Sequence, residues 1–437
     1  VNTGPSGDDF WTKLDCTPFL KTFLELSREI EIPEGKCQET APAESTVKTH
    51  FPVENPNLVL EPYVEKMAEK FDRELYSKEY GYSNAIQTED PVIQLFPHQQ
   101  AKDDTLMWAT IDQRLAITTK SENETEFALK KDIGDLLFIN YHRAMKLPKN
   151  PIPFDKDLWQ SCKNEVQKTY LSKDVGSIIN GVARQDPDFP INEIKLFLKS
   201  QWVKKVEKLG MVVKPGQTIA SFAQAPVMLY GTMARYMRRM REIYQPSNIF
   251  INCEKTPADL DEWAKANWNF EGLAHSNDFT AFDQSQDGAM LQFEVIKAKF
   301  HNIPSDIINS YVELKTNAKV FLGVLKIMRL SGEGPTFDAN TECSIAYHHT
   351  KYWVEPDVAQ VYAGDDSAQD RTPVPRPSFN KIKDRLGLVS KPLTHRQVPG
   401  DFATFCGWII TPKGVIKDPL KLYASLQIGR ASCRERV

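Results

Sequence analysis

Two aspartates, Asp365 and Asp366, stand side by side after Gly364 and a run of apolar and small residues at 361–363. This β-favouring run followed by a glycine predicts a strand that ends in a tight hairpin, with both carboxylates at its tip. A lone Gly-Asp-Asp is more often a solvated turn than a site. Adjacent like charges repel one another, however, so this pairing favours a place where a cation binds.

A second pair of aspartates, Asp278 and Asp283, lies upstream. Residues 277–282 alternate as a strand does, and the apolar residues between 290 and 300 recur at helical spacing. We therefore expect Asp278 on a strand, and Asp283 where that strand gives way to the helix. Either aspartate could cap the helix, but Asp287 immediately precedes it and is the better cap. Asp278 and Asp283 are then left for another role.

A glycine-rich loop separates the two aspartate pairs. It begins at Ser331 and Gly332 and leads into a predicted helix, on which Thr336 and Asn340 are i,i+4 neighbours on one face. One interpretation is a helix N-terminus with a flexible lead-in. The other is a loop whose backbone passes close to a ligand, with Asn340 presented to that ligand.

The three segments together resemble motifs A, B and C of the palm domain of viral RNA-dependent RNA polymerases. The first motif is D-x4-D, from Asp278 to Asp283. The second, SGxxxTxxxNT, begins 48 residues after Asp283. The third is Gly-Asp-Asp, in which Asp365 lies 25 residues after Asn340. The amino-acid sequences of these segments are similar to those of the replicases of flexuous plant and fungal viruses, the potexvirus-like members of the tymovirus order. The likeness runs from about residue 90 to 427.

The resemblance implies a metal-dependent nucleotidyltransferase. Two Mg²⁺ ions, for which Mn²⁺ can substitute, clamp the attacking and leaving oxygens, and Mg²⁺ prefers carboxylate ligands. Asp278 and Asp365 match the main metal ligands, with Asp366 assisting. Asp283 and Asn340 match the positions that recognise the ribose 2'-hydroxyl, which both donates and accepts hydrogen bonds. Ser331, Gly332 and Thr336 belong to the same nucleotide-binding motif.

Two later segments extend the resemblance. Residues 390–395 resemble motif D, whose lysine, here Lys391, is implied to protonate the leaving pyrophosphate; the alternative is a plain surface lysine. Residues 380–389 predict a short helix. Residues 405–419 alternate around Pro412-Lys413-Gly414, which predicts a hairpin and resembles motif E.

Basic residues are concentrated between positions 195 and 241. This stretch holds ten lysines and arginines and one acid, Glu207, a local charge of 10 − 1 = +9 in a chain whose total is −4. The asymmetry indicates a triphosphate or RNA channel, with a solvated basic face as the alternative. Lys214 is the candidate triphosphate contact, and the candidate RNA contacts are Lys204, Lys205, Arg235, Arg238 and Arg239.

The chain of 437 residues is 41% hydrophobic, which excludes a disordered protein. Its seven cysteines form no CxxC pair, which indicates reduced thiols and argues against a zinc site. We find no transmembrane run, no signal peptide and no P-loop. These features predict a cytosolic protein that is not secreted, and the resemblance implies that the cytoplasm is that of the host.

The expected fold is α+β: a right-hand polymerase with fingers and palm and with the thumb missing, the palm being an antiparallel sheet backed by helices. The predicted divisions are a post-helicase segment and linker (1–90), an N-terminal extension with fingers (91–277), a palm carrying motifs A to E and inserted fingers elements (278–427), and a sequencing-adapter artefact (428–437).

The resemblance also implies partners. These are an RNA template and primer, NTPs, helicase and capping domains upstream in the same polyprotein, and host membranes reached through other regions as part of a replication complex. Two rival functions remain open. A reverse transcriptase shares the metal chemistry, but Asp283 with Asn340 disfavours it, because a DNA-making enzyme excludes the 2'-hydroxyl. A catalytically dead palm that serves as an RNA-binding scaffold is disfavoured by the intact aspartates.

Overall fold

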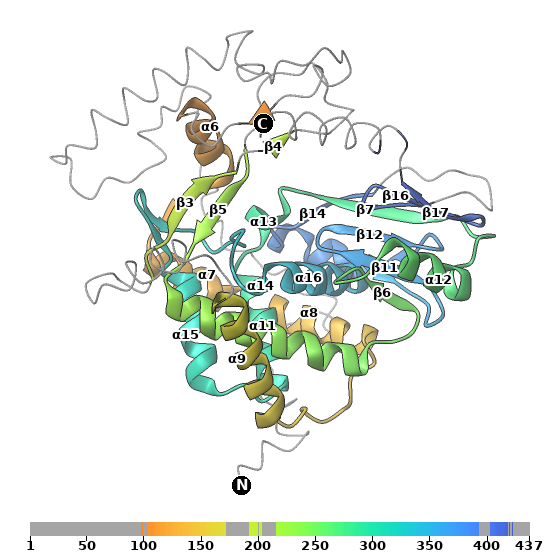
Figure 1. The fold of residues 1–437 in the computed structure, drawn as a ribbon, viewed down its shortest axis with the longest axis horizontal. Coiled ribbons are helices and arrows are strands. Elements are labelled where there is room, and N and C mark those ends of the chain that lie inside the picture. Colours follow the sequence, from red (N-terminus) through yellow and green to blue (C-terminus); the bar gives the residue numbers. More distant parts are fainter. Residues whose placement is uncertain are drawn as a thin grey trace, which may run out of the picture.

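A computed structural model describes residues 98–99, 104–171, 192–199, 201–202, 216–392 and 403–417, with the single residues 419 and 422. These residues form the mixed α+β fold that was expected (Figure 1). The predicted segments 1–90 and 428–437 lie outside the described residues, as do three of the candidate basic contacts: Lys204, Lys205 and Lys214.

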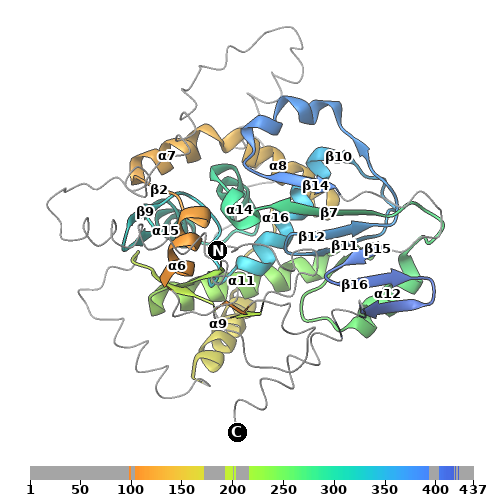
Figure 2. The same ribbon diagram turned by 90° about the horizontal axis from the view of Figure 1, so that it is seen from above.

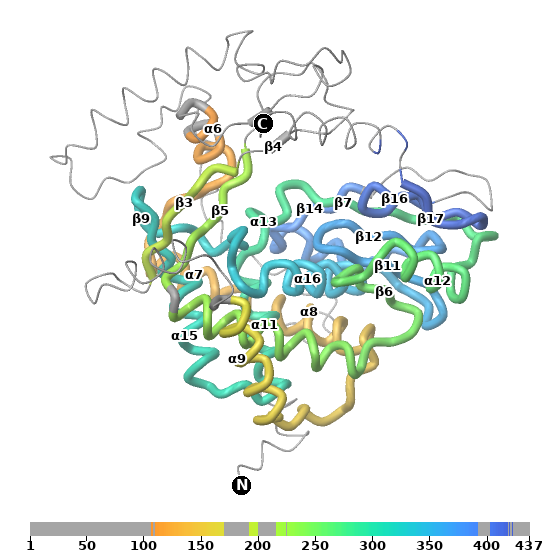
Figure 3. The backbone as a smooth tube through the Cα atoms, viewed as in Figure 1, coloured from red at the N-terminus to blue at the C-terminus, as the bar shows by residue number. Residues whose placement is uncertain are grey.

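The centre of the molecule is a five-stranded sheet. In spatial order its strands are β14 (Val389–Pro392), β7 (His275–Thr280), β12 (Asp366–Gln369), β11 (Gln360–Ala363) and β6 (Ile249–Ile251). Neighbouring strands run antiparallel except at one edge, where β6 runs parallel to β11. This parallel edge strand is an addition to the antiparallel sheet that was expected. It also places residues before 278 in the sheet, as the tube in Figure 3 shows.

The two faces of the sheet bury different cores, and the period-2 alternation of β11 shows why. Tyr362 packs into the larger core, with Phe279 of β7 and the helices beneath the sheet. Its neighbours Val361 and Ala363 point the other way, into a smaller core that includes Trp268. Because both faces are covered, all four residues of the strand are buried and its register is fixed.

Helices form a layer on the larger core. They are α6 (Asp104–Arg114), α7 (Lys120–Leu129), α8 (Lys131–Ala144), α9 (Lys156–Leu171), α11 (Gln224–Tyr244), α13 (Phe282–Ser285), α14 (Gly288–Phe300), α15 (Ser305–Thr316) and α16 (Thr336–Lys351). Helix α16 packs against β11, α8 packs against both α14 and α16, and α9 packs against α11. None of the helices in the described part of the chain is long and apolar enough to cross a membrane.

Helix α14 lies at the middle of this layer and is buried on all sides. Twelve of its thirteen residues are buried, and Lys299 is the exposed one. The predicted cap is confirmed: Asp287 is the N-cap, and its side chain accepts a hydrogen bond from the backbone N–H of Ala289. A carboxylate at this position satisfies one of the free N–H groups of the first turn.

The opposite face of the sheet is covered by α12 (Pro257–Asn267) and a three-stranded sheet. The strands of that sheet are β15 (Ala403–Phe405), β16 (Trp408–Thr411) and β17 (Gly414–Lys417). They lie at one end of the molecule when it is seen from above (Figure 2). The hairpin predicted around Pro412 is therefore confirmed, as the connection between β16 and β17.

Short strands complete the described fold. They pair as β3 (Lys195–Leu198) with β5 (Thr218–Ser221), β2 (Ile117–Thr118) with β9 (Gly323–Leu325), β8 (Lys319–Val320) with β9, β1 (His98–Gln99) with β4 (Gln201–Trp202), and β10 (Tyr352–Trp353) with β13 (Val374–Pro375).

The short helix predicted at 380–389 is wrong. The chain instead makes two 3-10 turns, Pro377–Lys381 and Lys383–Arg385, and Val389 already belongs to β14. Phe379, Ile382, Leu386 and Leu388 are all buried in the larger core. Their spacing resembles that of a helix, but burial of all four side chains against the larger core favours the two 3-10 turns instead.

Candidate active site

The paired aspartates lie where they were expected, at the tip of the β11–β12 hairpin. Ala363 pairs with Asp366, so Gly364 and Asp365 form a two-residue loop. Gly364 has φ +61° and is the first loop residue, the position at which a type II′ turn needs a positive φ. Its backbone N–H donates to Thr341 Oγ1 at 2.9 Å, and Thr341 is fully buried on α16. The helix therefore holds the hairpin tip in place.

Asp278 lies on β7, between β12 and β14. The β12 register pairs Ser367 with Asn277, so the next step along the ladder brings Asp366 level with Asp278. On the other side, β14 pairs Lys391 directly with Asp278. Directly opposed residues in an antiparallel pair point to the same face, with Cβ atoms ~5 Å apart. Lys391 is exposed and lies beside the carboxylates; its role as a proton donor stays a prediction.

The carboxylates influence one another electrostatically. The pKa of Asp365 is raised to about 6, first by burial against the hairpin and then by the charge of Asp366, with further contributions from Asp278 and Asp283. Four acidic groups therefore share one electrostatic environment. Oxygen-only donors that repel each other when ionised are the donor set that Mg²⁺ suits.

The described residues contain no group of three or more His, Cys, Asp or Glu side chains gathered closely enough to hold a metal ion. The donor chemistry fits a divalent ion, and the metal ligands themselves stay a prediction.

Cys406 is a neighbour of the site that the motif spacing did not predict. It begins the turn between β15 and β16, and its thiol contacts Asp366. Burial raises the pKa of Cys406, as do the charges of Asp366 and Asp365, so the thiol stays protonated and is a neutral neighbour of the carboxylates. Cys406 lies 40 residues after Asp366 in the sequence (406 − 366), and no local pattern links the two.

Asp283 and Asn340 meet as a hydrogen-bonded pair. Asn340 Nδ2 donates to Asp283 Oδ1 at 2.9 Å, which joins α13 to α16. The backbone carbonyl of Asp283 also accepts a hydrogen bond from the N–H of Arg329 at 2.9 Å. The structure thus brings together the two residues predicted to recognise a ribose hydroxyl.

The loop that begins at Ser331 is fastened to β5. The Ser331 carbonyl accepts a hydrogen bond from the N–H of Ala220 at 2.7 Å. The Thr336 hydroxyl lies 2.8 Å from the Leu330 carbonyl and 2.7 Å from the Glu333 carbonyl, to which it can donate. Thr336 therefore closes the loop on itself. The glycines permit close backbone approaches, of Gly332 to β5 and of Gly334 to α11.

We expect Gly332→Ala to destabilise the protein by roughly 2 kcal/mol or more. Gly332 has φ +103°, and an added Cβ would lie 2.4 Å from the Ala220 carbonyl oxygen. Urea denaturation measures the change. Gly364→Ala is the control, because φ +61° strains the backbone there too but nothing lies within 4 Å of the added Cβ. Equal losses from the two variants would contradict the contact with β5.

The candidate RNA-binding arginines lie on α11 and are paired within the protein. Arg235 and Arg239 both form ion pairs with Glu165 of α9, and Arg238 pairs with Glu254 and Asp338. Arg241 is buried against Asp338 and Glu342. The local charge counted from the sequence therefore overstates the free positive charge of α11, because its acidic partners come from other segments. Binding of RNA by these arginines stays a prediction.

Arg114 is a cation near the site that lies outside the basic segment. It ends α6. Burial lowers its pKa and the carboxylate of Asp283 counteracts that effect, which places the guanidinium within electrostatic reach of Asp283. Arg114 was not predicted from the sequence, because it lies outside the basic stretch 195–241 and no local pattern links it to Asp283.

Comparisons with known proteins agree with this geometry. A family model described as RNA dependent RNA polymerase matches residues 152–435. The chain is 99% identical over 428 residues to the RNA replication protein of Strawberry mild yellow edge-associated virus, covering 98% of this chain and 32% of that protein. It is 59% identical to the RNA replication protein of Narcissus mosaic virus (98% of this chain, 26% of that protein) and 58% identical to that of Potato virus X strain HB (99% and 30%).

The chain thus spans about a third or less of the length of these curated relatives. The matched family covers the whole region from α9 to β17 that carries the aspartates, the glycine-rich loop and the Asp283–Asn340 pair. The resemblance drawn from the sequence motifs is confirmed. The chain belongs to the RNA-dependent RNA polymerase family, in the branch formed by the replication proteins of potexvirus-like viruses.

Proposed function

We propose that the chain catalyses template-directed transfer of NTPs to an RNA 3'-hydroxyl by a two-metal mechanism, and so replicates and transcribes a positive-strand RNA genome. The observation that carries this proposal is the strand register, which places Asp365 at the hairpin tip and Asp366 level with Asp278 on the neighbouring strand, together with the Asp283–Asn340 pair. Membership of the polymerase family supports it.

Each part of the site then has a task. Asp278 and Asp365 hold divalent metal, with Asp366 assisting, and the bound metal supplies Lewis-acid stabilisation of charge on the transferring phosphoryl group. Asp283 and Asn340 recognise the ribose 2'-hydroxyl. Lys391, directly opposite Asp278, donates a proton to the leaving pyrophosphate. Arg114 joins the cations that bind the triphosphate.

The right-hand arrangement is part of the proposal. The five-stranded sheet with α14 and α16 forms the palm, and the hairpin of β3 and β5 with α6 belongs to the fingers. The β5 contact to Ser331 supports a link between fingers and the nucleotide-binding loop. RNA template and primer are the polymeric substrates. Helicase and capping domains of the longer protein are the partners, in a replication complex on membranes of the host cytoplasm.

The test is magnesium-dependent primer extension on an RNA template by the full-length replication protein. We expect NTP incorporation, with dNTP disfavoured at least ~100-fold because the site is built to bond a hydroxyl. Asp278→Asn should abolish incorporation without loss of folded structure. Preferred incorporation of dNTP would instead indicate a reverse transcriptase. RNA binding without any incorporation would indicate a dead palm that acts as a scaffold.

A further inference from the structure

A series of buried hydrogen bonds, which we call the hydrogen-bond chain, runs from Arg329 through Gln286 to the Asp283–Asn340 pair. Gln286 Nε2 donates to Asn340 Oδ1 at 2.6 Å. Gln286 Oε1 in turn accepts two guanidinium N–H groups of Arg329, from Nε at 3.2 Å and Nη2 at 3.1 Å. Gln286 and Arg329 are each only 2% exposed. None of the motif residues predicted from the sequence includes either of them.

The hydrogen-bond chain can run in one direction only, because Arg329 at one end must donate and Asp283 at the other end must accept. A guanidinium can only donate hydrogen bonds, and an ionised carboxylate can only accept them. Arg329 therefore requires the oxygen of Gln286, which turns the Gln286 amino group toward Asn340. Asn340 must then accept with its oxygen and donate to Asp283 with its nitrogen. Reversing either amide would set donor against donor or acceptor against acceptor.

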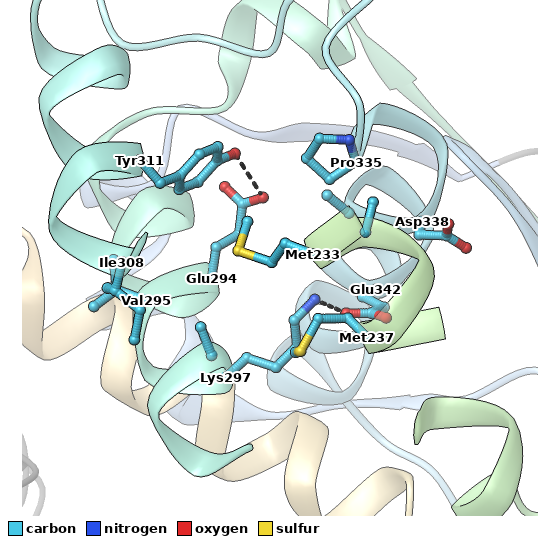
Figure 4. A pocket seen from close by; sticks show the side chains of 13 residues that line it. Met233, Met237, Glu294, Val295, Lys297, Ile308, Tyr311, Pro335, Asp338 and Glu342 are labelled. Atoms are coloured by element: carbon cyan, nitrogen blue, oxygen red, sulfur yellow. Dashed lines mark hydrogen bonds and ion pairs between the residues drawn. The ribbon is translucent and has the colours of Figure 1, made fainter. Parts of the chain in front are cut away.

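Arg329 is itself fixed by a buried ionic cluster. It pairs with Glu294 at 2.8 Å and with Glu333 at 3.1 Å. The Tyr311 hydroxyl donates to Glu333 Oε1 at 2.6 Å and lies 3.3 Å from Glu294 Oε1. Figure 4 shows Tyr311 and Glu294 facing each other beside the wall formed by α11. Lys315 also pairs with Glu333, at 3.0 Å. Breaking such a buried cluster is costly, so Arg329 has little freedom to move.

Arg329 also acts on Asp283 through its backbone. Its N–H donates to the Asp283 carbonyl, while its side chain orients Asn340 through Gln286. Arg329 therefore fixes the backbone position of Asp283 and, through Gln286, the orientation of the Asn340 amide. With Asn340 held in this way, the second amide hydrogen of Asn340 and the other carboxylate oxygen of Asp283 are available for a hydroxyl that both donates and accepts.

We infer that Gln286 and Arg329 are positioning residues that set the sugar specificity of the polymerase. They do this by fixing the amide of Asn340 in the orientation that a ribose 2'-hydroxyl needs. The inference rests on the proposed function, in which Asp283 and Asn340 recognise that hydroxyl. It assigns the source of the preference to a chain of directional hydrogen bonds behind the pair.

Gln286→Glu tests the direction of the chain at nearly constant shape. The new carboxylate still accepts from Arg329 but cannot donate to Asn340, so the Asn340 amide turns and sets its oxygen against Asp283. In primer extension by the full-length protein, the ratio of kcat/KM for NTP to that for dNTP should fall about tenfold or more, mainly through a higher KM for NTP. The kcat/KM for dNTP should stay within about twofold.

A purely structural defect gives a different result. Loss of folded enzyme lowers NTP and dNTP incorporation together and leaves their ratio unchanged. Gln292→Met is the matched control, because Gln292 is also buried and donates to Asp135 at 2.8 Å, but in the contact of α14 with α8. Both Gln292→Met and Gln286→Met should lower the stability of the protein. Gln292→Met should keep the wild-type ratio of NTP to dNTP incorporation, whereas Gln286→Met should lower that ratio.

Gln286→Met also decides the question if Gln286→Glu does not fold. Folded Gln286 variants that keep the wild-type ratio would overturn the inference. Asn340→Ala separates this failure from failure of the proposed function. If Asn340→Ala lowers the ratio and the Gln286 variants do not, ribose recognition stands and the positioning role falls. If Asn340→Ala leaves the ratio unchanged, ribose recognition by the pair is wrong and the inference falls with it.

Discussion

Asp365→Asn is expected to abolish nucleotidyl transfer and, at the same time, to stabilise the metal-free protein at neutral pH. Loss of a metal ligand removes several kcal/mol of transition-state stabilisation, so incorporation should fall roughly 10³-fold or more. The gain in stability has an electrostatic cause. In the folded protein the pKa of Asp365 is raised to about 6, by burial and by the neighbouring carboxylates, from an ordinary value of 3.8.

A raised carboxyl pKa makes folding less favourable as the group ionises. Between pH 4 and 6 the unfolded chain releases this proton before the folded chain does, so the free energy of unfolding falls as pH rises through that range. Asparagine carries no charge and avoids this cost. Because the Asp365 side chain is in contact with solvent, screening reduces the expected gain to about 1 kcal/mol at pH 7.5.

Urea denaturation of the metal-free protein at pH 7.5 and pH 4.5 measures this gain. The free energy of unfolding of Asp365→Asn should exceed that of the wild type at pH 7.5 and should lie closer to it at pH 4.5. Asp306→Asn is the control, because Asp306 is exposed in the first turn of α15 and should change neither activity nor this pH dependence. An active Asp365→Asn protein, or one less stable than the wild type at pH 7.5, would exclude the site described here.

Acidification should destabilise the protein steeply between pH 6.5 and pH 4.5, because three buried histidines resist protonation. Burial lowers the pKa of His301 and of His349 to about 4, and lowers the pKa of His348 well below its ordinary 6.5. Positively charged neighbours reinforce the effect: Lys297 near His301, Arg376 near His349 and Lys351 near His348. The rings of His275 and His349 also lower the pKa of His348, because a proton on one ring opposes a proton on the next.

The sign follows from proton binding in the two states. Below pH 6.5 the unfolded histidines take up protons that the folded ones do not, so stability is complete above that pH and is lost as pH falls. Each histidine contributes up to about 1.4 kcal/mol per pH unit. Three together approach about 4 kcal/mol per unit, a large share of the ~5–15 kcal/mol by which a domain is stable.

Urea midpoints at pH 7.5 and pH 5.5 test this expectation. The double substitution of His301→Asn and His349→Gln should remove more than half of the loss on acidification. His349 can be replaced by an amide because its Nε2 lies 2.9 Å from Gln360 Oε1, to which an amide can also donate. Lys299→Gln is the control, since it alters an exposed charge near His301 that does not titrate in this range. The same midpoint at both pH values in the wild type would refute the prediction.

The elements of the site were predictable from the sequence where their signals are local. Asp287 caps α14, Asp278 lies on β7, and the hairpin at Gly364 has the expected form. Each depends on a period or a turn residue within a few positions. The pairing of Asp283 with Asn340 came from the family resemblance, because local pattern says nothing about contacts between residues 57 positions apart.

What the sequence did not show is non-local. The parallel edge strand β6 joins β11 after more than a hundred intervening residues. The contacts of Gln286 with Arg329 and of Arg239 with Glu165 join segments 43 and 74 residues apart. The helix predicted at 380–389 was wrong for a different reason. Its local spacing was helical, but burial of Leu386 and Leu388 just before β14 determined the conformation.

The all-round burial of α14 limits how this region of the viral genome can vary. Each of its twelve buried positions meets neighbours on every side, so most codon changes there alter volume or charge in a closed space and cost about 1 kcal/mol or more. Near-neutral drift is confined to Lys299. Among related viruses, the thirteen codons of this helix should therefore tolerate far fewer amino-acid changes than those of α9 or α12, whose outer faces meet solvent.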